Sequence, residues 1–244
     1  VSSRTVGTSA GLSVSIKPSR CNGVAMMDLV NVPEFTLEVT WPITNGIAKD
    51  ETSDYAYGIT LRTITTSAQV KLIYTGNLRQ RNVSNWTEYF LEPYKIKQDI
   101  FVGFSSQTQA TITLTVPAPV SGDGIPEIGA FMFGNFVEVG DVGRDADAGA
   151  ESYTKVITDD WGISTITRRN YVKRVTYPVL VYNYALNRFF STMAELQSNP
   201  AVFVGSDDFR YSPFTVYGIV ESFNTGGDNG TASICNVNVK GIEL

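Results

Sequence analysis

Alternating polar and apolar residues mark the first half of the chain. The run 35–41 alternates aromatic or aliphatic residues with Thr and Glu, which is the period of two expected of a strand with one buried face. The run 110–116 repeats the pattern, with apolar residues on one face and threonines on the other. Further β-rich runs lie at 55–64, 69–74 and 100–104. Short strands of this kind, separated by Gly, Asn, Pro and Ser, predict an antiparallel β-sandwich over residues 1–120.

A stretch rich in Pro and Gly follows this first half. Residues 117–126 include Pro117, Pro119, Pro126, Gly122 and Gly124, so the stretch continues neither a central strand nor a helix. We place a domain boundary there, which gives domains 1–120 and 126–244. The alternative is a long loop inside one large sandwich.

The second half is also rich in β-forming residues. After an apolar run at 128–139 and an acidic loop of small residues at 140–151, two β-rich runs at 152–158 and 163–169 flank Asp159-Asp160-Trp161-Gly162. This is the chemistry of a hairpin turn, because aspartate starts turns and Gly162 can adopt a positive φ. A third run at 171–181 is expected to continue the hairpin as a meander. Two late strands, 214–223 and 231–239, are joined by the polar segment 224–230.

One segment has helical periodicity. Its apolar residues are Leu186, Phe189, Phe190, Met193 and Leu196, which fall on one face of a helix at about 184–198. Asn183 is the expected N-cap, and Asn199-Pro200 the expected stop. The predicted fold class is mainly β: an antiparallel β-sandwich followed by a second β-rich module with one flanking α-helix.

The amino-acid composition excludes most of the common kinds of catalytic site. The chain has 244 residues, no histidine and a formal net charge of −5. Without histidine there is no Ser/His/Asp triad, Cys/His dyad or His-bearing metal site. Neither a Gly-x-Ser-x-Gly element, a P-loop nor Gly-x-Gly-x-x-Gly occurs. We therefore expect no enzymatic activity and no cofactor, and the acidic charge makes nucleic acid an unsuitable main ligand.

Acidic residues offer two weaker candidates. Asp145, Asp147 and Glu151 could bind calcium, but their spacing does not match an EF-hand, and a solvated loop is favoured. The pairs Asp159-Asp160 and Asp207-Asp208 could be read as glycosidase carboxylates, but adjacent acids favour turns. We therefore predict no catalytic residue and no metal ligand.

The two cysteines and the start of the chain say little about function. Cys21 and Cys235 lie far apart in the sequence, and two buried free thiols are favoured over an end-to-end disulfide. The first residues show no apolar signal region, and no apolar run is long enough to cross a bilayer. We expect neither a targeting signal nor membrane insertion.

Basic and turn residues in the second half suggest contacts between subunits. Four cations flank Tyr171, and on an acidic protein such a strand favours a subunit interface with acids of a neighbouring copy, such as Asp145 and Asp147. The interface candidates are Asp160, Trp161, Gly162, Arg168, Arg169, Lys173, Arg174, Gly226, Gly227 and Asp228.

Aromatic residues in the first half suggest a second kind of surface. Exposed Trp and Tyr side chains stack on sugar rings, so glycan binding competes with core packing as an interpretation of these residues. The glycan-stacking candidates are Trp41, Trp86, Tyr55 and Tyr57. For any one of them, core packing is favoured.

The order of several short motifs resembles a known group of proteins. Ile128-Gly129-Ala130-Phe131-Met132-Phe133-Gly134, Asp160-Trp161-Gly162 and Arg169-Asn170-Tyr171 precede the helix. Ala201-Val202-Phe203-Val204-Gly205, Val216-Tyr217-Gly218 and Val237-Asn238-Val239-Lys240-Gly241-Ile242 follow it. In this order, over residues about 127 to 244, the second half resembles structural proteins of the tail tip and baseplate of tailed bacteriophages, such as minor tail or distal-tail proteins.

The resemblance implies a function and a location. It implies a virion subunit with a tail-tube-like module, assembled in the host cytoplasm into a homo-oligomeric ring, a trimer or hexamer, around the tail axis. Its partners would be other phage tail proteins. A receptor- or carbohydrate-binding module that recognises a host-surface glycan is the alternative.

Overall fold

The computed structural model describes residues 5–7, 11–56, 59–78, 97–118, 125–158, 161–162, 164–167, 171–206, 209–226 and 230–242. These residues form two compact units. The first unit holds the described residues up to Phe136 together with 209–212, and the second holds the rest of 137–242. The division therefore falls after Phe136, later than the boundary expected within 117–126. The reason is that the strand following that stretch pairs with the first unit.

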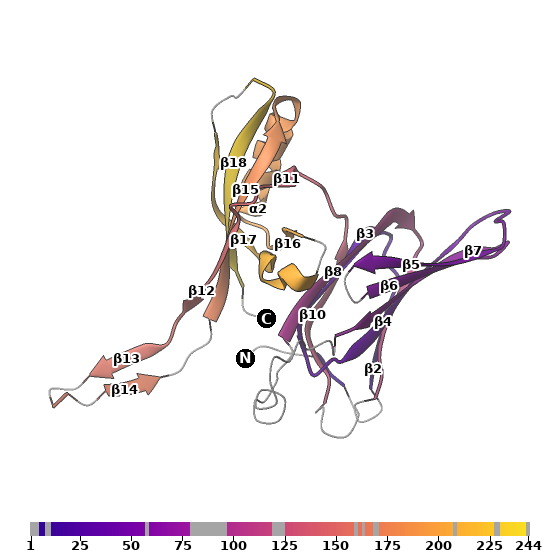
Figure 1. Ribbon diagram of the computed structural model, residues 1–244, viewed down its shortest axis with the longest axis horizontal. Helices are drawn as coiled ribbons and strands as arrows, with labels where there is room; N and C mark the ends of the chain where they lie inside the picture. The colour runs from indigo at the N-terminus through magenta and orange to yellow at the C-terminus, as the bar shows by residue number, and fades with distance from the viewer. Residues whose placement is uncertain are drawn as a thin grey trace. The chain divides into compact units, whose positions relative to one another are not determined.

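The first unit contains two antiparallel sheets (Figure 1). The smaller sheet has the order β1-β10-β3-β8, with β1 (Thr5–Val6), β10 (Glu127–Gly134), β3 (Arg20–Val30) and β8 (Lys97–Thr108). The larger has the order β2-β9-β4-β7-β6-β5, with β2 (Leu12–Ile16), β9 (Thr111–Val116), β4 (Glu34–Pro42), β7 (Gln69–Asn77), β6 (Ile59–Thr65) and β5 (Lys49–Ala56).

One hydrophobic core joins the two sheets. Val24, Met26 and Val102 come from the smaller sheet, while Leu37 and Leu114 come from the larger, and all five are buried in one cluster. The predicted β-sandwich is therefore confirmed. Burial along β4 and β9 alternates as their sequences predict, because each strand turns one face to this core.

Strand β3 has no counterpart among the predicted strands. Its residues from Gly23 to Leu29 are all buried, so polar residues do not alternate with apolar ones. The pairing of β3 with β8 is also irregular between Met26 and Leu29, where Asp28 has a φ of 55°. The backbone N–H of Asp28 donates to Oδ1 of Asp99 at 2.7 Å, which satisfies a buried donor at this bulge.

The second unit is built around one antiparallel sheet with the order β11-β15-β18-β17-β16, and β12 also pairs with β15. Its strands are β11 (Asp141–Val142), β12 (Asp147–Ser152), β15 (Tyr171–Tyr182), β16 (Ala201–Val204), β17 (Thr215–Thr225) and β18 (Ala232–Gly241). A separate two-stranded ribbon consists of β13 (Lys155–Thr158) and β14 (Ser164–Thr167). The mainly β fold class with a single α-helix is confirmed for the described residues.

Two local expectations in this region are wrong. The segment 140–151 is not an irregular loop throughout, because β12 pairs with β15 from Asp147↔Thr176 to Ser152↔Tyr171. The strand at 171–182 does not continue the β13–β14 hairpin as a meander, because its neighbours are β12, β11 and β18. Small residues in β12 pair well within the ladder although their sequence carries no β signal.

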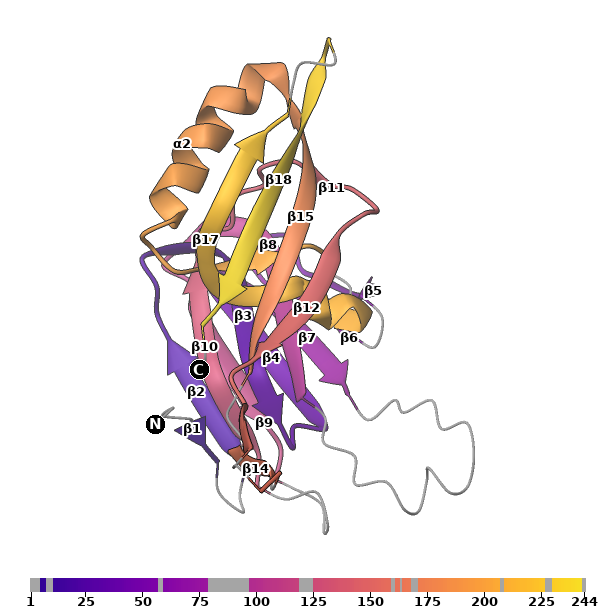
Figure 2. The ribbon, with the colours of Figure 1, turned by 90° about the vertical axis from the view of Figure 1, so that its left-hand side faces the viewer.

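The predicted helix is present but shorter than expected. A 3₁₀ turn, η1 (Asn183–Ala185), precedes α2 (Leu186–Leu196), which lies beside β17 (Figure 2). Phe189 and Met193 are buried against the sheet. A second 3₁₀ segment, η2 (Phe209–Phe214), precedes β17. No helix in the described ranges has both the length and the hydrophobicity that a membrane span requires.

Asn183 is not the N-cap of this helix. That position is taken by Ala185, which makes no side-chain cap. The Asn183 amide instead donates to the Gly230 carbonyl at 3.1 Å, and its Oδ1 accepts from Ser233 Oγ at 3.1 Å. Asn183 therefore ties the start of the helix to β18 and the turn before it.

Candidate interaction surface

The sheet of the second unit has two faces of different character. Residues 175, 177, 179 and 181 of β15 pack with α2 in a buried cluster. The intervening residues point to the opposite face, since side chains alternate along a strand. We call this opposite face of β15, β17 and β18 the open face, because its side chains are exposed or half-exposed.

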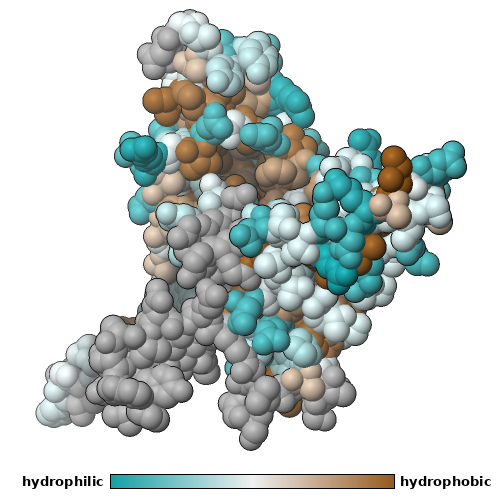
Figure 3. All heavy atoms as spheres, turned by 45° about the vertical axis from the view of Figure 1, so that its right-hand side comes forward, coloured by the Kyte–Doolittle hydropathy of each residue, from teal (hydrophilic) through white to brown (hydrophobic). Residues whose placement is uncertain are grey.

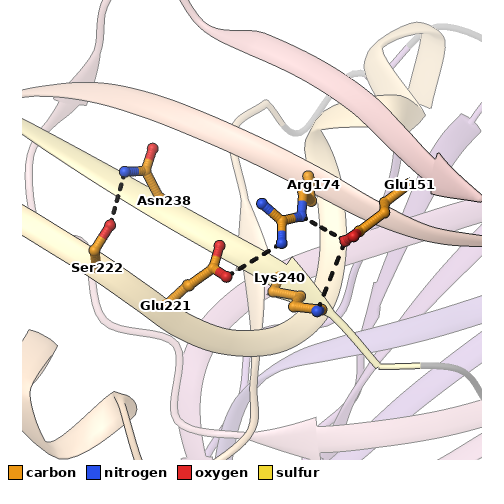
Figure 4. Close-up of polar contacts among 6 residues, drawn as sticks. All are labelled: Glu151, Arg174, Glu221, Ser222, Asn238 and Lys240. Carbon is orange, nitrogen blue, oxygen red and sulfur yellow. Dashed lines mark hydrogen bonds and ion pairs between the residues drawn. The ribbon is translucent and has the colours of Figure 1, made fainter.

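A charged network lies at one end of the open face (Figure 4). Nε of Arg174 lies 2.8 Å from Oε2 of Glu151, and its NH2 group lies 3.2 Å from Oε1 of Glu221. Lys240, which stands opposite Arg174 in the β15–β18 ladder, lies 3.7 Å from the same Glu151 oxygen. Two carboxylates thus hold together two neighbouring cations that would otherwise repel each other.

Lys240 also interacts with Tyr153. Its ammonium group lies 5.7 Å from the centre of the Tyr153 ring. A hydrogen bond with Tyr153 is the main cause that raises the pKa of Lys240, and the charge of Glu151 adds to this effect. The lysine is therefore held in its charged form at this end of the face.

Neutral polar side chains occupy the middle of the open face. The Thr176 hydroxyl donates to Oδ1 of Asn238 at 2.9 Å. The Asn238 amide in turn donates to the Ser222 hydroxyl at 2.9 Å (Figure 4). One step further, Oδ1 of Asn224 accepts from the backbone N–H of Asn236 at 3.1 Å. These bonds cross three strands and fix the side chains as a polar ladder.

The other end of the open face is apolar. Leu180 and Ile234 stand directly opposite each other across β15 and β18, and both are exposed. Beside them, the rings of Tyr182 and Tyr184 stack at 5.8 Å with an interplanar angle of 13°, and Tyr184 is 88% exposed. Hydrophobic residues reach the surface over this unit (Figure 3). A cluster of this kind on a sheet face is typical of contact sites.

An acidic edge borders the apolar end. Asp141 stands opposite Leu180 in the β11–β15 ladder, and Asp145 and Asp147 follow it along the chain. All three carboxylates are exposed, and none forms an ion pair with a residue that the structure describes. Asp141, Leu180 and Ile234 therefore form one row across three adjacent strands.

The β13–β14 ribbon, which we call the arm, pairs with no other strand that the structure describes. Val156 and Ile166 form a direct cross-strand pair and are 59% and 61% exposed. On the same face, the hydroxyls of Thr158 and Ser164 lie 2.9 Å apart. The described residues of β13 and β14 are all exposed, on either face of the ribbon. A hairpin of two strands without further packing is only marginally stable in water.

The tip of the arm carries part of the predicted turn. Trp161 is 88% exposed, and Gly162 has the positive φ, 80°, that we expected of it. Asp160 lies outside the described residues, as do Arg168, Arg169, Gly227 and Asp228. The hairpin itself is confirmed by the pairing of β13 with β14.

The other interface candidates have partners within the chain. Arg174 pairs with Glu151 and Glu221, and Nζ of Lys173 donates to the Thr215 carbonyl at 3.3 Å. Gly226 donates its N–H to Ile234 at 2.9 Å, and a Cβ at this glycine would lie 2.2 Å from the Ile234 carbonyl oxygen. Lys173 and Gly226 therefore have structural roles, and Arg174 belongs to the open face.

Two of the glycan-stacking candidates are described, and both lie in the first unit. Trp41 packs against the sandwich core. Tyr55 packs edge-on against Tyr74 at 5.0 Å, and its hydroxyl accepts from the Gly103 N–H at 2.8 Å. These contacts favour core packing over glycan stacking. Trp86 and Tyr57 lie outside the described residues.

The cysteines are two free, buried thiols, the interpretation that the sequence favours. Burial raises the pKa of both thiols, which keeps them protonated at neutral pH. Glu151, one of three acids considered for calcium, is held by Arg174. Within the described ranges, no three Cys, Asp or Glu side chains lie close enough to bind a metal ion. The pairs at 159–160 and 207–208 lie outside those ranges.

Comparison with known proteins gives no relative. No protein-family model matches the chain, and neither a curated protein nor a solved structure matches it.

Sequence reasoning missed the apolar end of the open face. Tyr182 and Tyr184 lie two residues apart at the junction of a strand with a 3₁₀ turn, which brings their rings into contact. Leu180 and Ile234 are 54 residues apart and meet only through strand register. The one available signal was the continued β15 alternation, which sets residues 180 and 182 on the face away from the core.

Proposed function

We propose that the chain is a structural subunit of a bacteriophage tail tip or baseplate that assembles with further copies into a ring around the tail axis. The observation that carries the proposal is the arm, whose Val156–Ile166 pair and Trp161 are exposed on a ribbon that pairs with no further strand of the described residues. Such an element gains stability when another chain covers it.

The second unit offers matching features for assembly. Its open face combines an ordered polar ladder with an apolar end, the mixture found in protein–protein interfaces. A subunit whose donor element and acceptor surface differ makes heterologous contacts, and such contacts close into rings when the rotation between copies fits. The motif order of residues 127–244 supports a place in the tail.

Location in the particle tests the proposal. Antibodies raised against the chain are expected to label the tail tip of purified phage in immunogold electron microscopy, and the chain is expected in mass spectra of those particles. Label on the head, or particles that lack the chain, would overturn the proposal. The native mass of the purified chain, alone and with its tail partners, is expected to correspond to a trimer or a hexamer.

Glycan binding is the second candidate, and the stacked Tyr182–Tyr184 pair favours it. An exposed aromatic ring is suited to stacking on sugar rings. A glycan array separates the two candidates. Binding that is lost in Tyr184→Ala and kept in Tyr211→Ala, an exposed tyrosine elsewhere in the chain, would support recognition of a host glycan.

A further inference from the structure

We infer that the arm of one copy docks on the row Asp141–Leu180–Ile234 of a second copy. This inference rests on the proposed ring and names the two surfaces that would build it. The donor is the Val156–Ile166 face of the arm, and the acceptor is the apolar end of the open face with its acidic border.

The acceptor matches the donor in shape and polarity. Each side presents two branched aliphatic side chains that stand directly opposite each other on adjacent antiparallel strands. On each side, hydroxyl or amide groups continue the same face, with Thr158 and Ser164 on the arm and Asn236 on the sheet. Two flat β surfaces with this pattern can bury their apolar pairs and keep their polar groups at the rim.

The opposite face of the arm is a poorer donor. Its described pairs are Ile157 opposite Thr165 and Lys155 opposite Thr167, and neither of them is apolar on both strands. This difference selects the Val156–Ile166 face and supplies a matched control.

Charge contributes to the approach of the arm, although Lys155 lies on the face opposite the Val156–Ile166 pair. Lys155 is exposed and forms no ion pair with any residue that the structure describes, and the arm's described residues include no acid. Asp141 borders the acceptor, and Asp145 and Asp147 extend the negative edge. The hairpin sequence 155–167 holds one lysine and two aspartates, so any electrostatic steering toward the acidic edge rests on Lys155 and makes the association rate only weakly salt-dependent.

The arm and the row Asp141–Leu180–Ile234 lie too far apart along β15 to meet within one copy, so the contact joins two copies. The arm leaves the sheet beyond the last β12–β15 pair, Ser152↔Tyr171, whereas Leu180 lies nine positions further along the same strand. At about 3.3 Å per residue this separation is on the order of 30 Å. Donor and acceptor therefore sit at opposite ends of one strand, and docking joins copies head to tail in a heterologous contact.

Complementary variants test the inference. Val156→Asp with Ile166→Asp removes the donor and keeps the acceptor, whereas Leu180→Asp with Ile234→Asp does the reverse. Each variant alone is expected to lose self-association by at least about 30-fold. An equal mixture retains one intact donor and one intact acceptor, so mass photometry is expected to show a complex of two chains that grows no further.

Matched controls guard against misfolding. Ile157→Asp changes the other face of the arm, and Ile47→Asp changes an exposed isoleucine of the first unit, so both are expected to assemble as the wild type does.

The outcomes separate this inference from the proposed ring. If the wild type assembles and both double variants assemble equally well, the docking site is wrong and the ring stands. If Ile157→Asp abolishes assembly while Val156→Asp with Ile166→Asp does not, the opposite face is the donor and the inference fails. A wild type that stays monomeric overturns the docking inference, and labelling of tail tips then decides the proposed function independently.

Discussion

The two units solve the problem of covering a β-sheet in different ways. In the first, two sheets cover each other, so their inner faces share one core. In the second, the eleven-residue helix α2 covers one face of a single sheet, and the open face keeps Leu180, Ile234 and Tyr182 exposed. The two sheets of a sandwich bury their apolar faces against each other. A sheet that is covered on one face keeps its other face available for a partner.

The strand edges differ in the same way. The edge strand β5 of the first unit is highly charged, and Asp50 forms a double contact with Arg62 at 3.0 and 2.7 Å. The hydrogen bond with Arg62 lowers the pKa of Asp50, so the pair stays charged. Charged edges discourage pairing with other chains. The arm of the second unit, by contrast, presents Thr, Val and Ile on a ribbon whose outer edges pair with no strand in the described part of the chain.

Removal of an aromatic ring from the core of the first unit is expected to cause the largest loss of unfolding free energy. Phe35→Ala empties a fully buried site between the sheets, and a loss of about 3–5 kcal/mol in unfolding free energy is expected. Because the two units have separate cores, amide hydrogen exchange should accelerate in the first unit and remain slow in β15 and β18. Equal acceleration in both units would show that they unfold together and would break the comparison.

Neighbouring rings on α2 test how much of the second sheet the helix covers. Phe189 is buried, so Phe189→Ala is expected to cost about 3–5 kcal/mol. Phe190 is 54% exposed and contacts Phe223 edge-on at 5.2 Å, so Phe190→Ala is expected to cost about 1 kcal/mol. Thermal unfolding of the two variants measures the difference. Equal losses would mean that the helix buries both rings.

Buried tyrosines provide a pH test in each unit. Burial raises the pKa of Tyr74 and Tyr177 far above the ordinary value of 10.0, so neither ionises readily in the folded state. The unfolded chain does release these protons above about pH 10, so stability is present below that pH and is lost as the pH rises.

Tyr177→Phe is expected to reduce this alkaline loss. The variant also removes a 2.7 Å hydrogen bond to the Phe214 carbonyl, at a cost of about 1 kcal/mol at neutral pH. The corresponding bond of Tyr74 is longer, at 3.4 Å, so Tyr74→Phe is expected to cost less. Urea unfolding at pH 7 and pH 10.5 measures both effects. A steeper alkaline loss in either variant would contradict the assignment.

Substitutions in the charged network of the open face are expected to change the free energy of unfolding least. Arg174→Ala breaks two ion pairs of partly exposed groups, which are worth at most about 1 kcal/mol after solvent screening. The loss should shrink in high salt. Ser222→Ala, which removes one acceptor of the neutral ladder, provides a control that salt should leave unchanged. A loss of several kcal/mol in Arg174→Ala would instead mean that the network is buried by a partner.

Local sequence patterns predict the strands and the helix that bury one face only. The alternation at 35–41 and 110–116 predicts β4 and β9 because each contributes one face to the sandwich. The helical stripe predicts α2 for the same reason, and the turn chemistry at Trp161-Gly162 predicts the hairpin. In each case the physical cause acts over a few residues.

Tertiary structure decided the features that depend on distant neighbours. Strand β3 is buried on both sides, so its sequence carries no period of two. Small residues become strand β12 because β15 offers a ladder to pair with. The row Asp141–Leu180–Ile234 exists only because strand register brings together residues 39 and 54 positions apart. Register is set by the packing of whole strands, and no short stretch of sequence specifies it.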